Sequence, residues 1–401
     1  MERIGVYGGT FNPPHIGHLQ AAEQAIRTLG LDRLLLIPAG IAPHKQLPEH
    51  SASPAQRLEM LRIAAAGREK MEVSDLELKR DGPSYTADTV QALHDRHPDA
   101  KLVLLMGTDM LACFPQWREP ERILSCADIA VVCRGGKQEG ELIRKAREPI
   151  ERMGGRVVKV ENPVISISST QLRRLLAFQC ADAFLPAGVG GYIRQNELYD
   201  CCASWKNLPM EELERVVTRL LNPNRVAHVL GCRDTAVELA RRWGADVTDA
   251  GRAGLLHDIT KALDGPLQLT LCRAYGTVLS EFSQKNPKTL HALTGSLVAR
   301  RIFGENERVV SAIRHHTTGK ADMNLLEMIL YVADYMEPNR DFPGVERLRT
   351  LAFTDLEGAL KLGLEMTLDH LKEQGSEVSP ESREALDYLN GRSIPERTKI
   401  C

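Results

Sequence analysis

A glycine-rich run near the N-terminus has the composition of a phosphate-binding loop. It reads Gly8-Gly9-Thr10-Phe11-Asn12-Pro13-Pro14-His15-Ile16-Gly17-His18 and stands between an apolar segment and a helical pattern. The leading glycines let backbone amides approach a ligand closely. The start of the following helix offers unpaired N–H groups and a positive dipole to phosphate. His15 and His18 are three residues apart at this helix entry, so both imidazoles can face the same phosphates.

A second group of residues has the chemistry of a metal centre. The C-terminal half holds six of the twelve histidines, and five of them form an ordered set with two aspartates: His228, His257, Asp258, His291, His315, His316 and Asp334. A carboxylate buried on an apolar helix is costly unless it is paired or metal-bound. Imidazole and carboxylate together suit Fe, Mn, Zn or Ni, and an aspartate next to a histidine can bridge two ions. His370 has no such context.

The elements that must position these groups differ between the two halves. In the first half, apolar runs at 4–7, 34–37, 102–105, 129–132 and 157–160 alternate with helical patterns at 18–29, 56–66, 86–94 and 169–178. Alternating strands and helices predict a doubly wound parallel sheet, Rossmann-like, in which the glycine run follows the first strand. After about residue 205 only helical spacing remains, at 209–221, 225–243, 248–262, 288–303, 306–316, 323–336 and 354–374. This half is expected to be all-α.

Length and composition set the frame for these predictions. A chain of 401 residues suits two domains, which we place at 1–202 and 203–401, with a seam at 200–209. The net charge of -2 gives no general field that would attract nucleic acid or an acidic membrane. The nine cysteines lack a CxxC pair, and we expect reduced thiols in a cytoplasmic protein. Neither a signal peptide nor a membrane helix is expected, and a homo-oligomer is compatible with the sequence.

The N-terminal motifs resemble those of a known superfamily. The glycine–histidine run is similar to the T/HxGH signature of nucleotidyltransferases, and in detail to the nicotinate-nucleotide adenylyltransferase branch. Further matches follow in order: Ala42-Pro43-His44-Lys45, Ser84-Tyr85-Thr86-Ala87-Asp88-Thr89, Met106-Gly107-Thr108-Asp109, Trp117, Arg134, Ile167-Ser168-Ser169-Thr170-Gln171-Leu172-Arg173, and Gly191-Tyr192-Ile193 with Leu198-Tyr199. The only departure noted is Leu172 where the family has isoleucine. The resemblance covers about residues 1–200.

This resemblance implies transfer of AMP from ATP to nicotinate mononucleotide. It implies that His15, His18, Lys45 and Arg173 contact the ATP phosphates and the leaving group, with Mg²⁺ bridging phosphate oxygens. Substrate-binding positions would be Gly8, Gly9, Thr10, Phe11, Thr86, Asp88, Gly107, Asp109, Trp117, Arg134, Ser168, Ser169 and Thr170. Trp117 would stack on the pyridine, and Ser168 to Thr170 form a hydroxyl-rich helix start that suits phosphate or capping.

The C-terminal pattern resembles the HD phosphohydrolase superfamily. His315-His316-Thr317-Thr318-Gly319, followed by Tyr331-Val332-Ala333-Asp334 and Glu337-Pro338-Asn339-Arg340, is similar to the YqeK-type family. That family splits diadenosine tetraphosphate symmetrically into two ADP. The resemblance implies one metal ion on His228, His257, Asp258 and Asp334. It implies a second on His291 and His315 with Asp258 as a catalytic bridge, iron being the first choice. Lys261 and Arg340 are candidates for neutralising substrate phosphate.

Several alternatives remain open at this point. The first domain could act on another acceptor, as cytidylyl- or pantetheine-phosphate adenylyltransferases do. The second could be a broader nucleotide phosphohydrolase, or a module that senses nucleotides without hydrolysing them. His316 could be a ligand or lie behind one. We hypothesise that the fusion either removes adenylylated by-products or links NAD synthesis to the level of diadenosine tetraphosphate.

Overall fold

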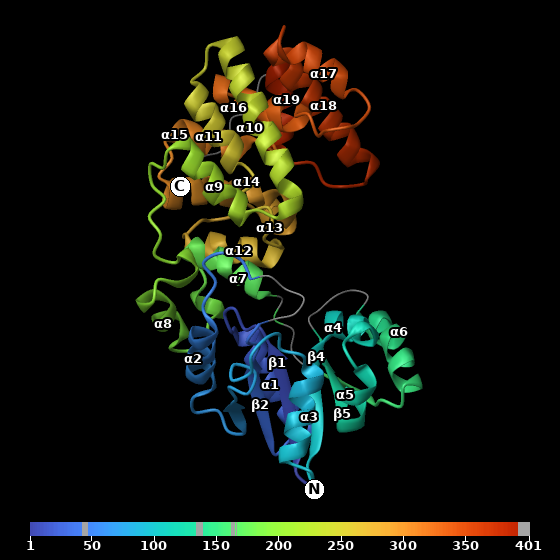
Figure 1. The fold of residues 1–401 in the computed structure, drawn as a ribbon. Helices are drawn as coiled ribbons and strands as arrows, with labels where there is room; N and C mark the ends of the chain where they lie inside the picture. Colours follow the sequence, from blue (N-terminus) through green and yellow to red (C-terminus); the bar gives the residue numbers. More distant parts are fainter. Residues whose placement is uncertain (42–46, 134–138, 162–164, 166, 392–401) are drawn as a thin grey trace. The chain divides into compact units, whose positions relative to one another are not determined.

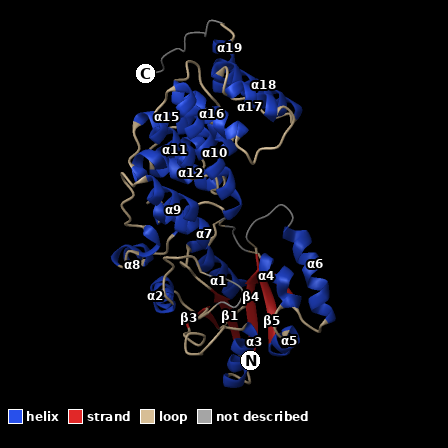
Figure 2. Cartoon of the chain, turned by 45° about the horizontal axis from the view of Figure 1, so that its top comes forward, coloured by secondary structure: helices blue, strands red, loops and turns tan. Residues whose placement is uncertain are grey.

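A computed structural model describes residues 1–41, 47–133, 139–161, 165 and 167–391. The chain divides into two compact units, Met1–Ala203 and Ser204–Cys401. The described strands all belong to the first unit, and the described elements of the second are helical (Figures 1 and 2). This confirms the predicted fold class, a parallel α/β sheet followed by an all-α domain.

The first unit is built on a six-stranded parallel sheet. Its strands are β1 (Arg3–Gly9), β2 (Arg33–Pro38), β3 (Met71–Val73), β4 (Lys101–Gly107), β5 (Ala127–Val132) and β6 (Val157–Val160), in the order β3-β2-β1-β4-β5-β6. Five of them match the apolar runs in the sequence. The sequence did not predict β3, because three residues are too few to show a strand period. The chain first adds strands on one side of β1 and then continues with β4 on the other side. This change of side leaves a crevice at the carboxyl ends of β1 and β4.

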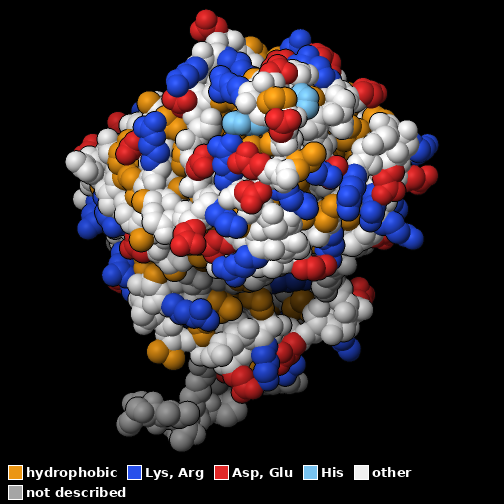
Figure 3. All heavy atoms as spheres, turned by 90° about the horizontal axis from the view of Figure 1, so that it is seen from below, with side chains coloured by type: hydrophobic (Ala, Val, Ile, Leu, Met, Phe, Trp, Pro, Cys, Tyr) orange, Lys and Arg blue, Asp and Glu red, His pale blue; other side chains and the backbone are white. Residues whose placement is uncertain are grey.

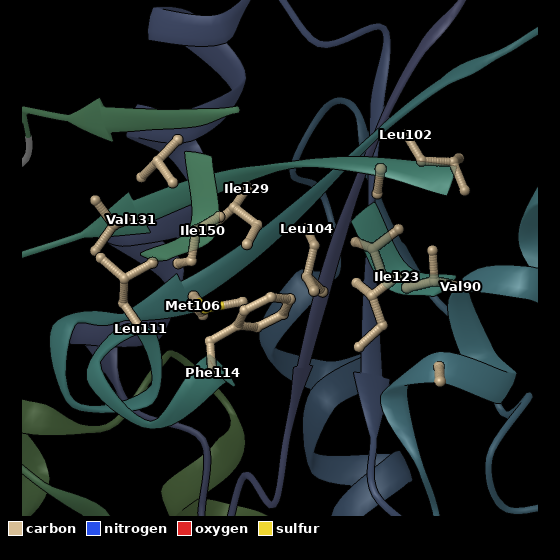
Figure 4. Packing of buried hydrophobic residues seen from close by; sticks show 14 of the residues in the cluster. Val90, Leu102, Leu104, Met106, Leu111, Phe114, Ile123, Ile129, Val131 and Ile150 are labelled. Atoms are coloured by element: carbon tan, nitrogen blue, oxygen red, sulfur yellow. The ribbon is translucent and has the colours of Figure 1, made fainter. Parts of the chain in front are cut away.

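Helices cover this sheet and fill its core. They are α1 (Ile16–Leu29), α2 (Pro54–Ala65), α3 (Thr86–Arg96), α4 (Thr108–Cys113), α5 (Pro120–Cys126), α6 (Glu139–Arg152), α7 (Ser169–Ala177) and α8 (Val189–Gln195), with short 3₁₀ turns η1 (Phe114–Gln116), η2 (Asp182–Phe184) and η3 (Leu198–Asp200). Figure 4 shows the Phe114 ring beside Met106 and Leu104 of β4. This packing fixes the end of β4 where the crevice begins.

The second unit consists of helices joined by short loops. They are α9 (Met210–Leu220), α10 (Pro223–Trp243), α11 (Val247–Leu256), α12 (Gly265–Ala274), α13 (Glu281–Lys285), α14 (Leu290–Val298), α15 (Glu307–His315), α16 (Leu325–Met336), α17 (Val345–Ala352), α18 (Leu356–Glu373) and α19 (Pro380–Leu389), with turns η4 (Pro287–Thr289) and η5 (Ala299–Phe303). The tightest pairing joins α10 to α11, and α16 packs on both. Of the predicted metal ligands, His228 lies on α10 and Asp334 on α16, and His257 and Asp258 directly follow α11.

One predicted helix ends earlier than its apolar pattern suggested. We expected a helix over 248–262, but α11 ends at Leu256. The amides of Ile259 and Lys261 bond to carbonyls three residues back, which makes consecutive tight turns. The Thr260 hydroxyl lies 3.1 Å from the His291 carbonyl oxygen of α14 and donates to it. Tertiary bonds therefore hold the segment after α11 in turns, and the pattern of apolar residues alone could not show this.

The surface and the thiols agree with an ordinary globular chain. The face in Figure 3 mixes acidic and basic side chains, in keeping with the small net charge. Within the described ranges, no helix has both the length and the apolar character needed to cross a bilayer. The eight described cysteines are free, including the adjacent Cys201 and Cys202, whose sulfur atoms lie 3.5 Å apart.

Candidate functional sites

The glycine run lies at the crevice of the sheet, as the sequence predicted. Gly8 and Gly9 end β1, and Gly107 ends the adjacent strand β4. The loop from Thr10 to Pro14 then leads into α1, whose cap residue is His15. Ligands of open α/β sheets bind at this kind of crevice, beside the carboxyl ends of the strands. The arrangement can receive a phosphate chain on backbone N–H groups.

The two histidines of the run form a stacked pair at the entry of α1. The ring centroids of His15 and His18 lie 3.6 Å apart, and the rings are inclined by 28°. The backbone N–H of His15 donates to Nδ1 of His18 at 3.2 Å, which fixes the second ring. Gly17 is required here, because a Cβ at this position would lie 3.0 Å from Nδ1 of His15. The structure therefore brings together both histidines that the sequence predicted.

Two arginines donate hydrogen bonds to carbonyl groups of the same loop and its surroundings. Arg57 of α2 is 1% exposed and donates to the carbonyl oxygens of Thr10 at 2.8 Å and Gly40 at 3.2 Å. Arg173 of α7 donates to the carbonyl oxygen of Asn12 at 2.8 Å. Burial lowers the pKa of both guanidinium groups. Neither forms an ion pair with a carboxylate in the described part of the chain, so two positive charges stand uncompensated beside the loop.

The hydroxyl-rich start of α7 docks on the loop instead of standing free. Ser168 caps the helix, and its hydroxyl accepts the N–H of Gln171 at 3.2 Å. Ser169 donates its hydroxyl to the carbonyl oxygen of Pro13 at 3.0 Å. Thr170 accepts from Arg173 at 3.2 Å. The predicted phosphate-binding residues Ser169 and Arg173 therefore reach the glycine run. Ser168 acts as a helix cap, which is the other role that a hydroxyl-rich helix start suits.

The residues predicted to bind the pyridine nucleotide lie around α3, α4 and η1. Thr86 opens α3, and the carboxylate of Asp88 pairs with the guanidinium of Arg122. Trp117 is half-buried, with its ring centroid 5.3 Å from that of Phe114. Asp109 is exposed in the first turn of α4. Lys45, with the segment 42–45, and Arg134 lie outside the described residues, so their predicted roles remain predictions.

In the second unit, four side chains converge at one point. His228 comes from α10, His257 and Asp258 follow α11, and Asp334 comes from α16. Nε2 of His228 lies 3.2 Å from Nε2 of His257 and 3.1 Å from Oδ1 of Asp334. Nε2 of His257 lies 3.5 Å from Oδ2 of Asp258. Atoms bound at about 2.1 Å to one ion lie roughly 3–3.5 Å apart, which fits this spacing.

The hydrogen bonds of the four buried histidines show which ring nitrogen is free to bind a metal. Nδ1 of His257, His291 and His316 lies 2.7–2.9 Å from the carbonyl oxygens of Gly254, Lys288 and Ile313. A carbonyl oxygen can only accept, so each Nδ1 carries a proton, and Nε2 is the ring nitrogen left for a metal. Nδ1 of His228 likewise faces Oε1 of Glu337 at 3.1 Å.

The ionisation of the cluster suits a metal centre. Burial lowers the pKa of His257 to about 4 and that of His291 to about 3, so both rings are neutral near pH 7. Burial alone would raise the pKa of Asp258, but the neighbouring imidazoles and the Lys261 ammonium bring it well below its ordinary value. Oδ1 of Asp258 is buried and has no hydrogen-bond partner among the described residues. A buried carboxylate oxygen that lacks a donor and lies beside imidazole nitrogens fits a divalent-metal site.

A second group of ligand atoms lies on the other side of Asp258. Its Oδ1 is 3.4 Å from Nε2 of His291 and 3.8 Å from Nε2 of His316. The Thr317 hydroxyl lies 3.2 Å from Nε2 of both histidines. Lys261 is 2.9 Å from Nε2 of His291. Asp258 therefore stands between two candidate positions, which is the bridging place that the sequence suggested.

The structure places His316, and not the predicted ligand His315, with the other candidate ligands. We expected this residue as the ligand, but its Nδ1 bonds to the Ser311 carbonyl oxygen at 2.9 Å and lies 3.5 Å from the buried Glu327. His316 instead shares the inward face of α15 with Val309 and Ile313, seven and three residues earlier. Helical spacing therefore turns His316 toward the cluster and His315 away from it. This spacing was visible in the sequence.

Comparison with known proteins agrees with these two sites. The Cytidylyltransferase-like family model matches residues 6–175, and the HD domain model matches 225–339. A Bacillus licheniformis protein named "Probable nicotinate-nucleotide adenylyltransferase" is 37% identical over 201 residues, which is 50% of this chain and all of that protein. An Aeromonas salmonicida protein of the same name is 43% identical over 208 residues, 49% of this chain and 96% of that one. The chain belongs to the nicotinate-nucleotide adenylyltransferase family.

This member of the adenylyltransferase family carries an HD domain as its second unit, and such a domain indicates a phosphohydrolase. A solved structure from Clostridium acetobutylicum, described as a "predicted HD superfamily hydrolase involved in NAD metabolism", is 36% identical. It corresponds to 46% of this chain and 99% of its own, with a TM-score of 0.45. The two family models and the adenylyltransferase relatives confirm the predicted fusion of an adenylyltransferase with an HD domain.

Two candidate residues of this adenylyltransferase–HD chain escaped the sequence predictions. Arg57 lies on the apolar face of α2, aligned with Leu61 and Ala64, a spacing that could have marked it as buried. Glu337 follows Asp334 by three residues and is 1% exposed, with Oε2 accepting from the Asn339 backbone at 2.7 Å. Both residues orient the predicted site residues and need not touch a ligand.

Proposed function

We propose that the first unit transfers AMP from ATP to nicotinate mononucleotide. The observation that carries this proposal is the stacked His15–His18 pair at the crevice, beside a loop held by two arginines that pair with no carboxylate among the described residues. The acceptor phosphate oxygen attacks the α-phosphorus of ATP, the bond to the bridging oxygen of the β-phosphate breaks, and pyrophosphate leaves. Positioning and charge neutralisation suffice for such a reaction.

The roles of the residues follow from their positions. We assign His15, His18 and Arg173, together with Lys45, to the ATP phosphates and the leaving pyrophosphate. Mg²⁺ bound to ATP would neutralise phosphate charge. Thr86, Asp88 and Trp117 would bind the acceptor, with the tryptophan ring stacked on the pyridine. The names of the relatives support nicotinate mononucleotide as the acceptor.

Product analysis of the full chain tests this assignment. With ATP and nicotinate mononucleotide, we expect deamido-NAD and pyrophosphate in equal amounts. Nicotinamide mononucleotide, phosphopantetheine and CTP with choline phosphate serve as competing substrates. Turnover with one of these alone would overturn the proposal and favour another branch of the superfamily.

For the second unit, we propose metal-dependent hydrolysis of diadenosine tetraphosphate into two ADP. The convergence of His228, His257, Asp258 and Asp334 carries the metal-dependent part of this proposal. A divalent ion there lowers the pKa of water and neutralises charge on the phosphate. These four residues would hold it, and His291 and His316 with Asp258 would hold a second. We propose iron as the native metal, with manganese, zinc and nickel as alternatives, and the cytoplasm as the compartment, which the free thiols support.

The choice of substrate rests on the YqeK-like sequence pattern and is tested by the products. Symmetric cleavage gives ADP alone, whereas asymmetric cleavage gives ATP and AMP. The full chain is assayed with the adenylyltransferase inactivated by His18→Ala, so that the two activities do not mix. Release of AMP or nucleosides would indicate a broader phosphohydrolase. If the metal-loaded protein hydrolyses no dinucleoside polyphosphate or nucleotide, the unit acts as a sensor.

A further inference from the structure

Two arginines donate hydrogen bonds to the carboxylates of the candidate metal cluster. Nε of Arg225 donates to Oδ2 of Asp258 at 2.6 Å. Nη2 of Arg340 donates to Oδ1 of Asp334 at 2.7 Å. These are the same oxygen atoms that face the imidazole Nε2 atoms of His228 and His257. The arginine side chains are 28% and 33% exposed, so both stand at the rim of the centre, where a substrate arrives.

The centre is therefore electrically balanced before any metal binds. Two carboxylates face two guanidinium groups, which stay charged at any pH that a protein tolerates. The imidazoles of His228, His257 and His316 each face an oxygen acceptor with Nδ1, so Nε2 is the ring atom directed at these carboxylates. Lys261 and Glu337 add one charge of each sign nearby.

One divalent ion added to this balanced centre leaves two positive charges in a largely buried place. Asp258 is 1% exposed, and His257 is fully buried. Uncompensated charge in such a place is costly, so an anion has to enter with the ion. A phosphate group supplies that charge, and arginine is the side chain best shaped to receive it, since its planar fork matches two phosphate oxygens.

Resting on the function proposed for this unit, we propose that metal and phosphate bind the HD centre cooperatively. Without metal, Arg225 and Arg340 neutralise Asp258 and Asp334. When a divalent ion binds these carboxylates, the two guanidinium groups turn to the incoming phosphate. The metal-loaded centre then forms fully only with substrate or product in place. The two arginines thereby couple the binding of the metal ion to the binding of the phosphate.

Measurement of metal affinity tests this coupling without any enzymatic assay. The probe is Mn²⁺ titrated into metal-free full-length protein, with the free ion followed by electron paramagnetic resonance. In the presence of inorganic phosphate we expect about tenfold tighter binding, within the usual range of coupling between two sites. The same titration on Asp258→Asn subtracts phosphate and metal that bind elsewhere. Equal Mn²⁺ affinity with and without phosphate would overturn the proposal.

Variants of the arginines identify the groups that carry the coupling. Arg225→Gln and Arg340→Gln should each bind Mn²⁺ more tightly in the absence of phosphate and lose most of the phosphate effect. Arg233→Gln is the matched control: it lies on the same helix as Arg225, but pairs with Glu214 at 2.7 Å. Weaker Mn²⁺ binding by both folded variants would show that the arginines only support the ligands, and would overturn the proposal.

The outcome is separable from that of the proposed function. If the wild-type chain hydrolyses diadenosine tetraphosphate but its Mn²⁺ affinity ignores phosphate, the coupling is wrong and the activity stands. If coupling appears without hydrolysis of any nucleotide, the centre is a phosphate-dependent metal site and the enzymatic proposal fails. Should one glutamine variant fail to fold, the other variant and the wild-type comparison still decide whether metal and phosphate bind cooperatively.

Discussion

Each unit places two arginines at its candidate site, but the arginines bind different partners. Among the described residues, Arg57 and Arg173 donate to neutral oxygens alone, chiefly the carbonyl groups of the glycine run. Arg225 and Arg340 donate to the carboxylates of Asp258 and Asp334. The first site thus leaves its positive charge available to an anion, whereas in the second the guanidinium groups pair with carboxylates that are proposed metal ligands.

This difference matches the chemistry that each site has to perform. An adenylyltransferase receives ATP with its own Mg²⁺ and needs standing positive charge for the triphosphate. A buried charge of this kind costs folding stability at Arg57. Burial lowers the pKa of its guanidinium group, and Nε has no hydrogen-bond partner among the described atoms. A hydrolase that holds a metal needs carboxylates to bind the ion. Without the ion, positively charged side chains have to balance the negative charge of these carboxylates.

The largest effect is expected at the carboxylate that both candidate metal positions share. Asp258→Asn keeps the volume of the side chain but removes the charge, so the metal should be lost and hydrolysis with it. The decrease should exceed the roughly 10–100-fold that follows loss of an outer partner of a ligand. Metal content by mass spectrometry and the rate of ADP release measure it. Adenylyl transfer should be unchanged; a parallel loss would contradict independent sites.

The second effect concerns the buried charge under the glycine run. Arg57→Met leaves the Thr10 and Gly40 carbonyl groups without their donor and removes positive charge. We expect a higher KM for ATP and a lower kcat, about 100-fold together, as for a small misplacement of reacting groups. Arg57→Lys should retain part of the ATP affinity, because it keeps the charge.

Arg62→Met on the same helix is the matched control, since Arg62 is exposed and pairs with Glu59 at 3.4 Å. Thermal unfolding of each variant separates lost stability from lost binding. If Arg57→Met folds and keeps the KM for ATP, the charge of Arg57 serves the fold alone. The contrast between the two units would then rest on Arg173.

The two units were also unequally predictable from the sequence. Apolar runs predicted five strands, because buried parallel strands need continuous apolar residues, but three residues of β3 left no pattern. The order of histidines and aspartates predicted the cluster in the second unit. It could not tell which oxygen atoms the arginines bind, because Arg225 reaches Asp258 only through the packing of α10 against α11, and Arg340 reaches Asp334 only through the turn that follows α16. Only the spacing of Arg57 with Leu61 and Ala64 on α2 pointed to its burial.

A smaller effect is expected at Glu337, which orients a ligand without binding metal. Its Oε1 faces Nδ1 of His228 at 3.1 Å. Glu337→Gln weakens the acceptor and places an amide N–H₂ near the donors of Asn339, so the ring of His228 should be held less firmly. Metal affinity should decrease by about 10–100-fold. Titration with Mn²⁺ checks this, and Glu346→Gln, an exposed carboxylate on α17, is the control. Unchanged affinity would mean that packing alone orients His228.

The smallest effect distinguishes the two adjacent histidines of α15. His315→Asn should leave metal content unchanged, because the His315 ring bonds to the Ser311 carbonyl oxygen and faces Glu327. Loss of one such hydrogen bond costs about 1 kcal/mol, which lowers Tm by about 2–4 °C in a domain of this size. His316→Asn should instead reduce the number of bound ions, since Nε2 of His316 faces Oδ1 of Asp258. If His315→Asn loses metal while His316→Asn keeps it, α15 presents the opposite residue to the centre, and the ligand set implied by the sequence resemblance is restored.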